Sequence, residues 1–141
     1  AHCFEGVTGI IFVASLSDYD QKMFEDETTN RMKDSVYLFR DICANPAFAE
    51  TPIILFLNKR DLFQKKIRDV RIVCEGCFRD YDGPPNDYAA GVDYFLRYFL
   101  KQNRDPDRKV FHHVTCATDT ANVQVVMDST RAMIIQDSLN F

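Results

Sequence analysis

Four polar residues follow a run of apolar ones, and their types and order could recognise a flat heterocyclic ring. The apolar run is Ile53–Leu57, and it is followed directly by Asn58, Lys59, Arg60 and Asp61. An ionised aspartate only accepts hydrogen bonds, so the two oxygens of Asp61 match a ring edge with two adjacent N–H donors. Guanine has such an edge, at N1 and its 2-amino group. Adenine has none, and the carboxylate left partly unpaired against it would cost about 1–3 kcal/mol, which predicts strong rejection.

The residues before Asp61 suit the same task. Asn58 carries both a donor and an acceptor, which could tie the loop and reach the other edge of the ring. Lys59 can lay its aliphatic stem over the ring face while its ammonium stays in water, and Arg60 is expected to point elsewhere. The simpler alternative is that a polar tetrapeptide after a strand is only a turn, since a short motif by itself is a hypothesis.

A second polar stretch follows another predicted strand. The stretch is Thr115–Thr118, sequence TCAT, at the end of the strand predicted over Lys109–Thr115. In open α/β sheets, ligands bind beyond the carboxyl ends of the strands. If this strand lies beside Pro52–Leu57, the two loops face one crevice, where a backbone N–H near Ala117 could donate to a carbonyl oxygen on the ring. The pair of loops therefore favours a binding pocket over an isolated turn.

Three segments are predicted to form the strands that position these loops. Val7–Ser15 and Pro52–Leu57 are nearly continuous apolar runs, as expected of parallel strands that are covered on both faces. The third, Lys109–Thr115, is more polar and suits the edge of a sheet.

Apolar residues at helical spacing lie between and after these strands. The first stripe is formed by Met32, Val36, Phe39 and Cys43. The expected helices are about Asn30–Cys43, Tyr88–Lys101 and Ala121–Leu139, with a short helix between the second strand and the second of these. Strands that alternate with helices predict one layered α/β unit with a mainly parallel sheet.

Composition limits the possible functions. The chain has 141 residues, enough for one domain and short for two. Its net charge of −4 argues against a nucleic-acid platform held by a basic field, and no apolar run approaches the length of a membrane span. The five cysteines are scattered and odd in number, which favours free thiols in a reducing cytosol. A local basic cluster is interpreted as solvated surface rather than a membrane-facing patch: Lys65, Lys66, Arg68 and Arg71.

Metal or redox chemistry is the weaker alternative. Cys74 and Cys77 form a C-x-x-C pair, but no second pair follows at zinc spacing, and the pair does not open a helix after a strand. His112 and His113 lie in the third predicted strand, so their side chains are expected on opposite faces, one half-buried and one exposed. Neither histidine has a visible nucleophile to activate.

Several segments resemble the alpha subunits of heterotrimeric G proteins. The resemblance covers residues 1–139, nearly the whole chain, and keeps the same order. It is carried by "FLNKRDLF" and "TCATDT", and by "HCFEGVTGIIFVASLSDYDQ", "EDETTNRMKDSVYLF" and "NVQVVMDSTRAMII". The first two alone would fit any Ras-like GTPase, whereas the flanking segments narrow the resemblance to the alpha subunits.

The resemblance implies a fold and a ligand. Residues 1–141 would be the C-terminal part of a Ras-like P-loop NTPase domain, a three-layer α/β/α structure with mainly parallel strands. The ligand would be GTP or GDP, with Mg²⁺ held by residues outside this chain. The implied base-binding residues are Asn58, Lys59, Asp61, Cys116, Ala117 and Thr118.

The resemblance also implies partners and a location. The parent protein would bind a G-protein beta-gamma dimer, a seven-helix receptor and an effector enzyme, as a signal transducer in the cytoplasm at the inner face of the plasma membrane. Receptors would meet the last helix and the loop Gln102–Lys109. Effectors would meet the helix Asn30–Cys43 and the loop Ala44–Thr51. Membrane association would depend on an N-terminal region that this sequence does not contain.

The groups that act on phosphate are absent from this sequence. It contains no G-x-x-x-x-G-K-[ST] loop, and the magnesium ligands, arginine finger and water-positioning glutamine of the family would lie upstream. We therefore expect no catalytic residue in this chain, and no GTP hydrolysis by it alone. The alternative function is a truncated or degenerate alpha-like interaction module without GTPase activity. The resemblance further implies that the first strand would expose an unpaired hydrophobic edge at Ile10–Val13.

Overall fold

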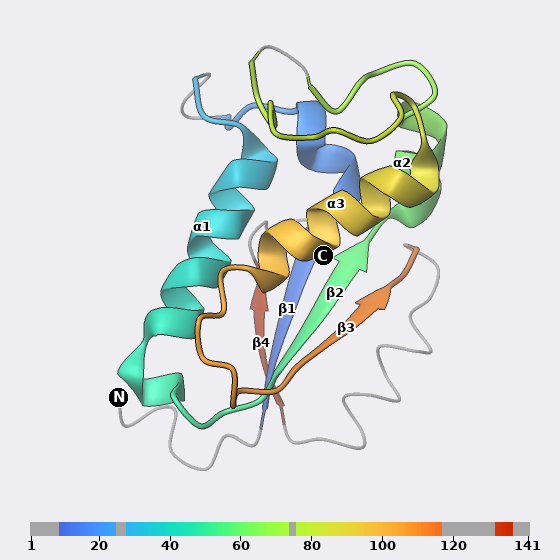
Figure 1. Ribbon diagram of the computed structural model, residues 1–141. Coiled ribbons are helices and arrows are strands. Elements are labelled where there is room, and N and C mark those ends of the chain that lie inside the picture. The colour runs from blue at the N-terminus through green and yellow to red at the C-terminus, as the bar shows by residue number, and fades with distance from the viewer. Residues whose placement is uncertain (1–8, 25–27, 74–75, 117–131, 137–141) are drawn as a thin grey trace.

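A parallel four-stranded sheet runs through the computed structural model, which describes residues 9–24, 28–73, 76–116 and 132–136 (Figure 1). Its strands lie in the order β3-β2-β1-β4, and each neighbouring pair is parallel. The more polar β3 lies at an edge of the sheet, as predicted. The strands are β1 (Gly9–Ser15), β2 (Ile53–Asn58), β3 (Val110–Val114) and β4 (Ala132–Gln136).

The two central strands follow from their continuous apolar sequence. Every residue of β1 is buried, and β2 is buried up to Leu57, as expected of the central strands of a parallel sheet. Their register pairs Ile10 with Ile53 and Ser15 with Asn58. The carboxyl ends of β1 and β2 are therefore level with each other.

Short-range signals set the helix boundaries. The helices are α1 (Arg31–Ala44), α2 (Arg60–Lys66) and α3 (Tyr88–Leu100), with two 3₁₀ helices, η2 (Leu16–Asp20) and η3 (Pro46–Phe48). Side-chain oxygens cap α1 and α3: Asn30 accepts from the Lys33 N–H and Asp87 from the Ala90 N–H. Asn45, next to Pro46, ends α1 close to the predicted boundary at Cys43.

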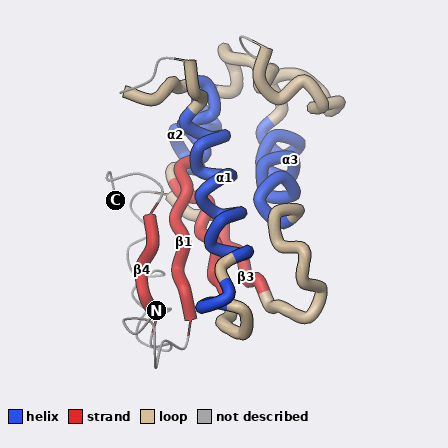
Figure 2. The backbone as a smooth tube through the Cα atoms, turned by 90° about the vertical axis from the view of Figure 1, so that its left-hand side faces the viewer, coloured by secondary structure: helices blue, strands red, loops and turns tan. Residues whose placement is uncertain are grey.

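All three α-helices pack on one side of the sheet (Figure 2). The core between them is rich in aromatic rings. Phe12 of β1 meets Phe39 of α1 edge-on at 5.1 Å between ring centroids, and Phe39 meets Phe99 of α3 at 5.7 Å. Phe95 and Phe99 of α3 are fully buried. The opposite face of the sheet is also buried at Ile11, Val13, Ile54 and Phe56.

The C-terminal segment differs from the prediction. Residues 132–136, expected within a helix over Ala121–Leu139, form strand β4 instead, and the remainder of that range lies outside the described residues. β4 pairs with β1 from Gly9↔Ala132 to Val13↔Gln136. The expectation of an unpaired edge at Ile10–Val13 is therefore wrong as well. Both differences have the same physical reason. The edge of β1 carries backbone N–H and C=O groups that pair with a strand at residues 132–136 and that a helix there would leave unpaired.

The described helices cover one face of the sheet only, so the third layer of the expected α/β/α architecture is not seen among the described residues. In the same part of the chain, no helix combines the length and apolar character that crossing a membrane requires.

Candidate functional site

The two predicted loops meet where β2 and β3 end. The Thr115 N–H donates to the Leu57 carbonyl at 2.9 Å, and the Arg60 N–H donates to the Thr115 carbonyl at 3.0 Å. The Thr115 hydroxyl lies 3.1 Å from Asn58 Oδ1 and donates to it. Thr115 is buried and Asn58 is half-buried. The expected adjacency of the two strand ends is present, and Asn58 ties the loops together.

The backbone turns sharply at Lys59. This residue precedes α2 with φ of 60° and ψ of 38°, in the left-handed region that residues other than glycine seldom occupy. Such a conformation costs about 1–3 kcal/mol and persists only where the surrounding structure imposes it. The turn lets the chain leave β2 at Asn58 and enter α2 at Arg60 within a single residue.

Asp61 lies in the first turn of α2 and is exposed, so its carboxylate is accessible to a ligand. Lys59 is half-buried beside it, and the Arg60 side chain is exposed. Cys116 follows Thr115 and is half-buried. Ala117 and Thr118, the other residues expected to complete the pocket, lie outside the described residues.

The segment after β1 brings a third group of polar residues to the same edge, which the sequence reasoning missed. Asp18 of η2 is only 8% exposed, and its Oδ2 lies 3.6 Å from Arg31 Nε at the start of α1. Ser15, at the end of β1, pairs in register with Asn58 and its hydroxyl is hydrogen-bonded to that of Ser17 at 3.0 Å. The available signal was the polar stretch Ser15–Asp20 directly after an apolar strand.

The electrostatic environment of Asp18 is mixed. Burial raises the pKa of its carboxyl above the ordinary value, because desolvation disfavours the charged form. Positive charges on Arg31, Lys59 and Lys66 act in the opposite direction, and the Asp20 carboxylate adds to the upward shift. Asp18 thus places a buried acidic group within electrostatic reach of Lys59, the residue that precedes α2.

The described residues that were considered for metal or redox chemistry are Cys77, His112 and His113. Cys77 is a half-buried free thiol, and Cys74 lies outside the described residues. His112 and His113 are both exposed, which corrects the expectation that one is half-buried; His113 stacks on Phe56 at 5.3 Å between ring centroids. Within the described ranges, no three histidine, cysteine or acidic side chains are grouped to hold a metal ion.

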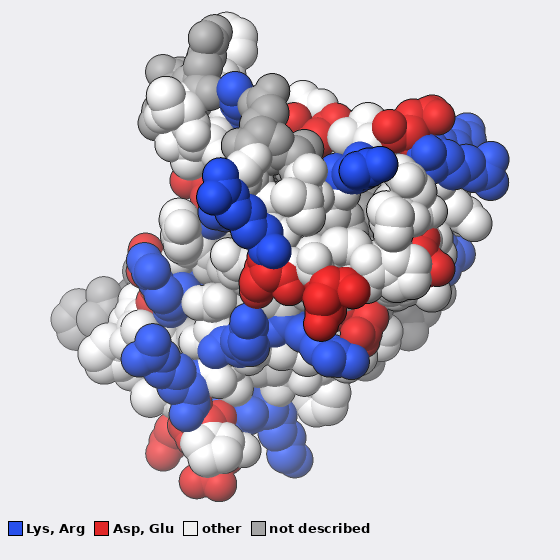
Figure 3. All heavy atoms as spheres, turned by 45° about the horizontal axis from the view of Figure 1, so that its top comes forward, with Lys and Arg blue, Asp and Glu red and all other residues white. Residues whose placement is uncertain are grey.

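Charges of both signs share the surface above the sheet. Figure 3 brings the upper loops of Figure 1 forward and shows Lys and Arg side chains interspersed with Asp and Glu. This face has no extended field of one sign among the described residues. The pattern agrees with the small net charge of −4.

Comparison with known proteins decides the family. A sequence model of the family "G-protein alpha subunit" matches residues 1–134. The chain belongs to the G-protein alpha subunit family. It is 46% identical over 138 residues to the guanine nucleotide-binding protein G(o) subunit alpha of Caenorhabditis elegans, a match that covers 98% of this chain and 38% of that protein. The parallel sheet with helices packed on it fits the Ras-like α/β fold of the family. The chain therefore spans well under half the length of this alpha subunit relative.

Proposed function

We propose that this chain is the base-reading part of a G-protein alpha subunit, a switch that binds GTP and GDP, hydrolyses GTP and transmits receptor signals. One observation carries the proposal. The hydrogen bond between Thr115 and Asn58 joins two strand-end loops, and the exposed Asp61 directly follows Arg60, whose N–H donates to the Thr115 carbonyl. Membership of the G-protein alpha subunit family supports the same proposal.

In the proposed complex, each side chain has a separate task. Asp61 accepts hydrogen bonds from N1–H and the 2-amino group of guanine, and Lys59 covers the ring with its stem. Asn58 braces the loop from below, and Cys116, with Ala117 and Thr118, completes the pocket.

The phosphate chemistry would come from elsewhere in the parent protein. We propose that residues 1–141 form the C-terminal part of the Ras-like domain, and that the phosphate loop, the magnesium ligands and the catalytic residues belong to the rest of it. Magnesium would neutralise charge on the transferred phosphoryl group. The family resemblance, not the structure, is the basis for assigning its ligands to the rest of the parent protein.

The proposed partners are a beta-gamma dimer, a seven-helix receptor and an effector enzyme, met at the inner face of the plasma membrane. The loop Gln102–Lys109 would face the receptor, and α1 with the loop Ala44–Thr51 would face the effector. A surface hollow of about 450 Å³ lies between these two loops, which supports a shared docking region. It is lined by Ala49, Glu50, Pro52, Asp105, Asp107, Arg108 and Lys109. Pro52 and Lys109 directly precede β2 and β3, so the hollow is at the end of the sheet opposite the base-reading loops.

The substitution Asp61→Asn in the full-length protein that contains this chain tests base recognition. An amide at this position can donate to the 2-oxo group of xanthine but cannot accept two bonds from guanine. We expect GTP affinity to fall by about tenfold or more, and the affinity for xanthosine triphosphate to rise. Asp69→Asn, at an exposed aspartate just beyond α2, is the matched control and should leave both affinities unchanged.

Two results would count against the proposal in different ways. If the unmodified full-length protein binds GTP and Asp61→Asn binds it equally well, the role of Asp61 is wrong. If the unmodified protein binds no guanine nucleotide, the alternative of a non-catalytic interaction module is favoured instead.

A further inference from the structure

Helix α2, which carries Asp61, is too short to fix its own orientation. It has seven residues, Arg60–Lys66, and of these only Phe63 is buried. Helices of this length are not stable by themselves in water, so tertiary contacts must set their position. Asp61 and Lys66 lie at opposite ends of the helix, about 7.5 Å apart along its axis.

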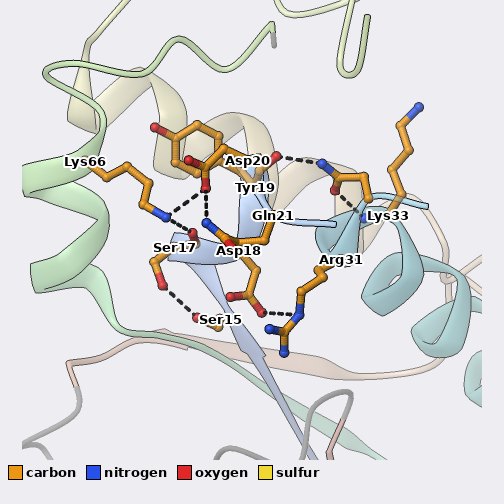
Figure 4. Close-up of polar contacts among 10 residues, drawn as sticks. Ser15, Ser17, Asp18, Tyr19, Asp20, Gln21, Arg31, Lys33 and Lys66 are labelled. Carbon is orange, nitrogen blue, oxygen red and sulfur yellow. Dashed lines mark hydrogen bonds and ion pairs between the residues drawn. The ribbon is translucent and has the colours of Figure 1, made fainter. Parts of the chain in front are cut away.

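Contacts at the start, in the middle and at the end of α2 hold it in place. At its start, the Arg60 N–H donates to the Thr115 carbonyl at 3.0 Å. In the middle, the ring of Phe63 packs edge-on against Tyr19 at 5.3 Å between centroids. At its end, Lys66 Nζ donates to the Ser17 carbonyl and to Asp20 Oδ1, both at 2.7 Å (Figure 4).

The Lys66 contact joins segments that are far apart in the sequence, and it is partly buried. Lys66 is separated from Ser17 by 49 positions and from Asp20 by 46, and the side chains of the Lys66–Asp20 ion pair are 25% and 19% exposed. Partial burial and a second, carbonyl acceptor distinguish it from an isolated surface ion pair, which contributes little. The Lys66 ammonium also lies 5.9 Å from the centroid of the Tyr19 ring.

The anchor point on η2 is itself held from both sides. The Tyr19 hydroxyl donates to the Val70 carbonyl at 2.7 Å, just beyond α2. Its own carbonyl accepts from Asn30 Nδ2 at 2.7 Å, and Asn30 caps α1. Asp18 faces Arg31 of α1 (Figure 4). Lys66 therefore connects α2 to a segment that is fixed to β1 and α1.

We propose that Lys66 is a positioning residue for base recognition, which fixes the far end of α2 and thereby the angle at which Asp61 meets the base. A seven-residue helix is about 10 Å long, so a tilt of about 15° moves its other end by about 2–3 Å. A displacement of that size breaks a hydrogen bond. This inference rests on the proposed function of Asp61.

The experiment compares two ligands that differ only at the group Asp61 is assigned to read. Inosine diphosphate lacks the 2-amino group of guanosine diphosphate and keeps N1–H. The affinities of the full-length protein for both are measured with Lys66→Met and with Lys65→Met, the exposed neighbour on the same helix. We expect Lys66→Met to reduce the preference for GDP over IDP by about fivefold or more, and Lys65→Met to leave it unchanged. Lys66→Arg, which keeps the charge and the donors, should restore most of the preference.

The ratio of the two affinities separates positioning from stability. A purely structural loss would lower the affinities for GDP and IDP by the same factor. An unchanged ratio of the two affinities in Lys66→Met would therefore overturn the inference. If Lys66→Met does not fold, Asp20→Asn decides the matter, since it weakens one of the two Lys66 contacts. A lowered ratio there supports the inference and an unchanged ratio overturns it. The proposed function fails separately, if Asp61→Asn leaves the GDP to IDP ratio unaltered.

Discussion

The hydrogen bond between Thr115 and Asn58 makes a quantitative prediction about how the two loops act. Thr115→Val keeps the shape of the side chain and removes the hydroxyl that donates to Asn58 Oδ1 at 3.1 Å. A neutral hydrogen bond of this kind contributes about 0.5–1.5 kcal/mol net. Asn58 is half-buried, so water can replace part of the lost bond. We therefore expect a loss of about 1 kcal/mol in nucleotide binding, which is a roughly fivefold weaker affinity.

A double-mutant cycle isolates this bond from other effects of the substitutions. Thr115→Val, Asn58→Ala and the double variant are compared by equilibrium nucleotide binding in the full-length protein. Because the two side chains share one bond, the coupling energy should be about 1 kcal/mol. Thr115→Ser is the control, since it keeps the hydroxyl and loses one buried methyl group, which costs about 0.8 kcal/mol in folding stability but little in affinity.

The cycle can also show that the two loops are not coupled through this bond. If the binding free energies lost in the two single variants sum to the loss in the double variant within about 0.3 kcal/mol, the loops do not act through this hydrogen bond. In that case the second loop is not braced by Asn58, and its role in base recognition loses its structural support.

Two further predictions concern stability and can be measured on this chain by urea denaturation. Gly91→Ala in α3 places a Cβ 2.8 Å from Ile67 Cδ1 and 2.9 Å from Phe63 Cζ. Overpacking costs about 1–3 kcal/mol and the higher helix propensity of alanine offsets about 1 kcal/mol, so the free energy of unfolding should fall by up to about 2 kcal/mol. An unchanged denaturation midpoint would contradict this. Asp18→Asn should flatten the pH dependence of stability. Because burial raises the pKa of the carboxyl, the stability linked to its protonation is present below about pH 3.9 and lost as pH rises through the folded value. As pH rises from acid to neutral, the free energy of unfolding of the variant should therefore increase relative to that of the unmodified chain. If the two chains show parallel profiles of stability against pH, the raised pKa of Asp18 is wrong.

The parts of the fold that were predicted correctly are those where one local pattern decides the outcome. The apolar runs of β1 and β2 are too continuous for a half-exposed strand, and the stripe in α1 has a clear cap at Asn30 and a clear end at Pro46. The adjacency of the strand ends then follows from the rules of parallel sheets.

The remainder of the site depends on contacts between distant segments. The left-handed backbone of Lys59 has no sequence signal, since lysine does not favour that conformation, and only the surrounding structure can impose it. The link from Lys66 to Ser17 and Asp20 joins groups 46 or more positions apart. In the sequence, Lys66 is one member of a basic cluster, and nothing local distinguishes it from the exposed Lys65.

The C-terminal segment shows why a helical pattern alone was insufficient. Residues 132–136 are Ala-Met-Ile-Ile-Gln, and a short apolar run of this kind cannot be assigned to a helix or a strand by periodicity. The deciding factor is the open edge of β1, whose backbone groups pair with β4 in a parallel ladder. β4 lies on the far side of β1 from β2 and β3. The base-reading loops follow β2 and β3, so the contacts among Asn58, Arg60 and Thr115 do not involve β4.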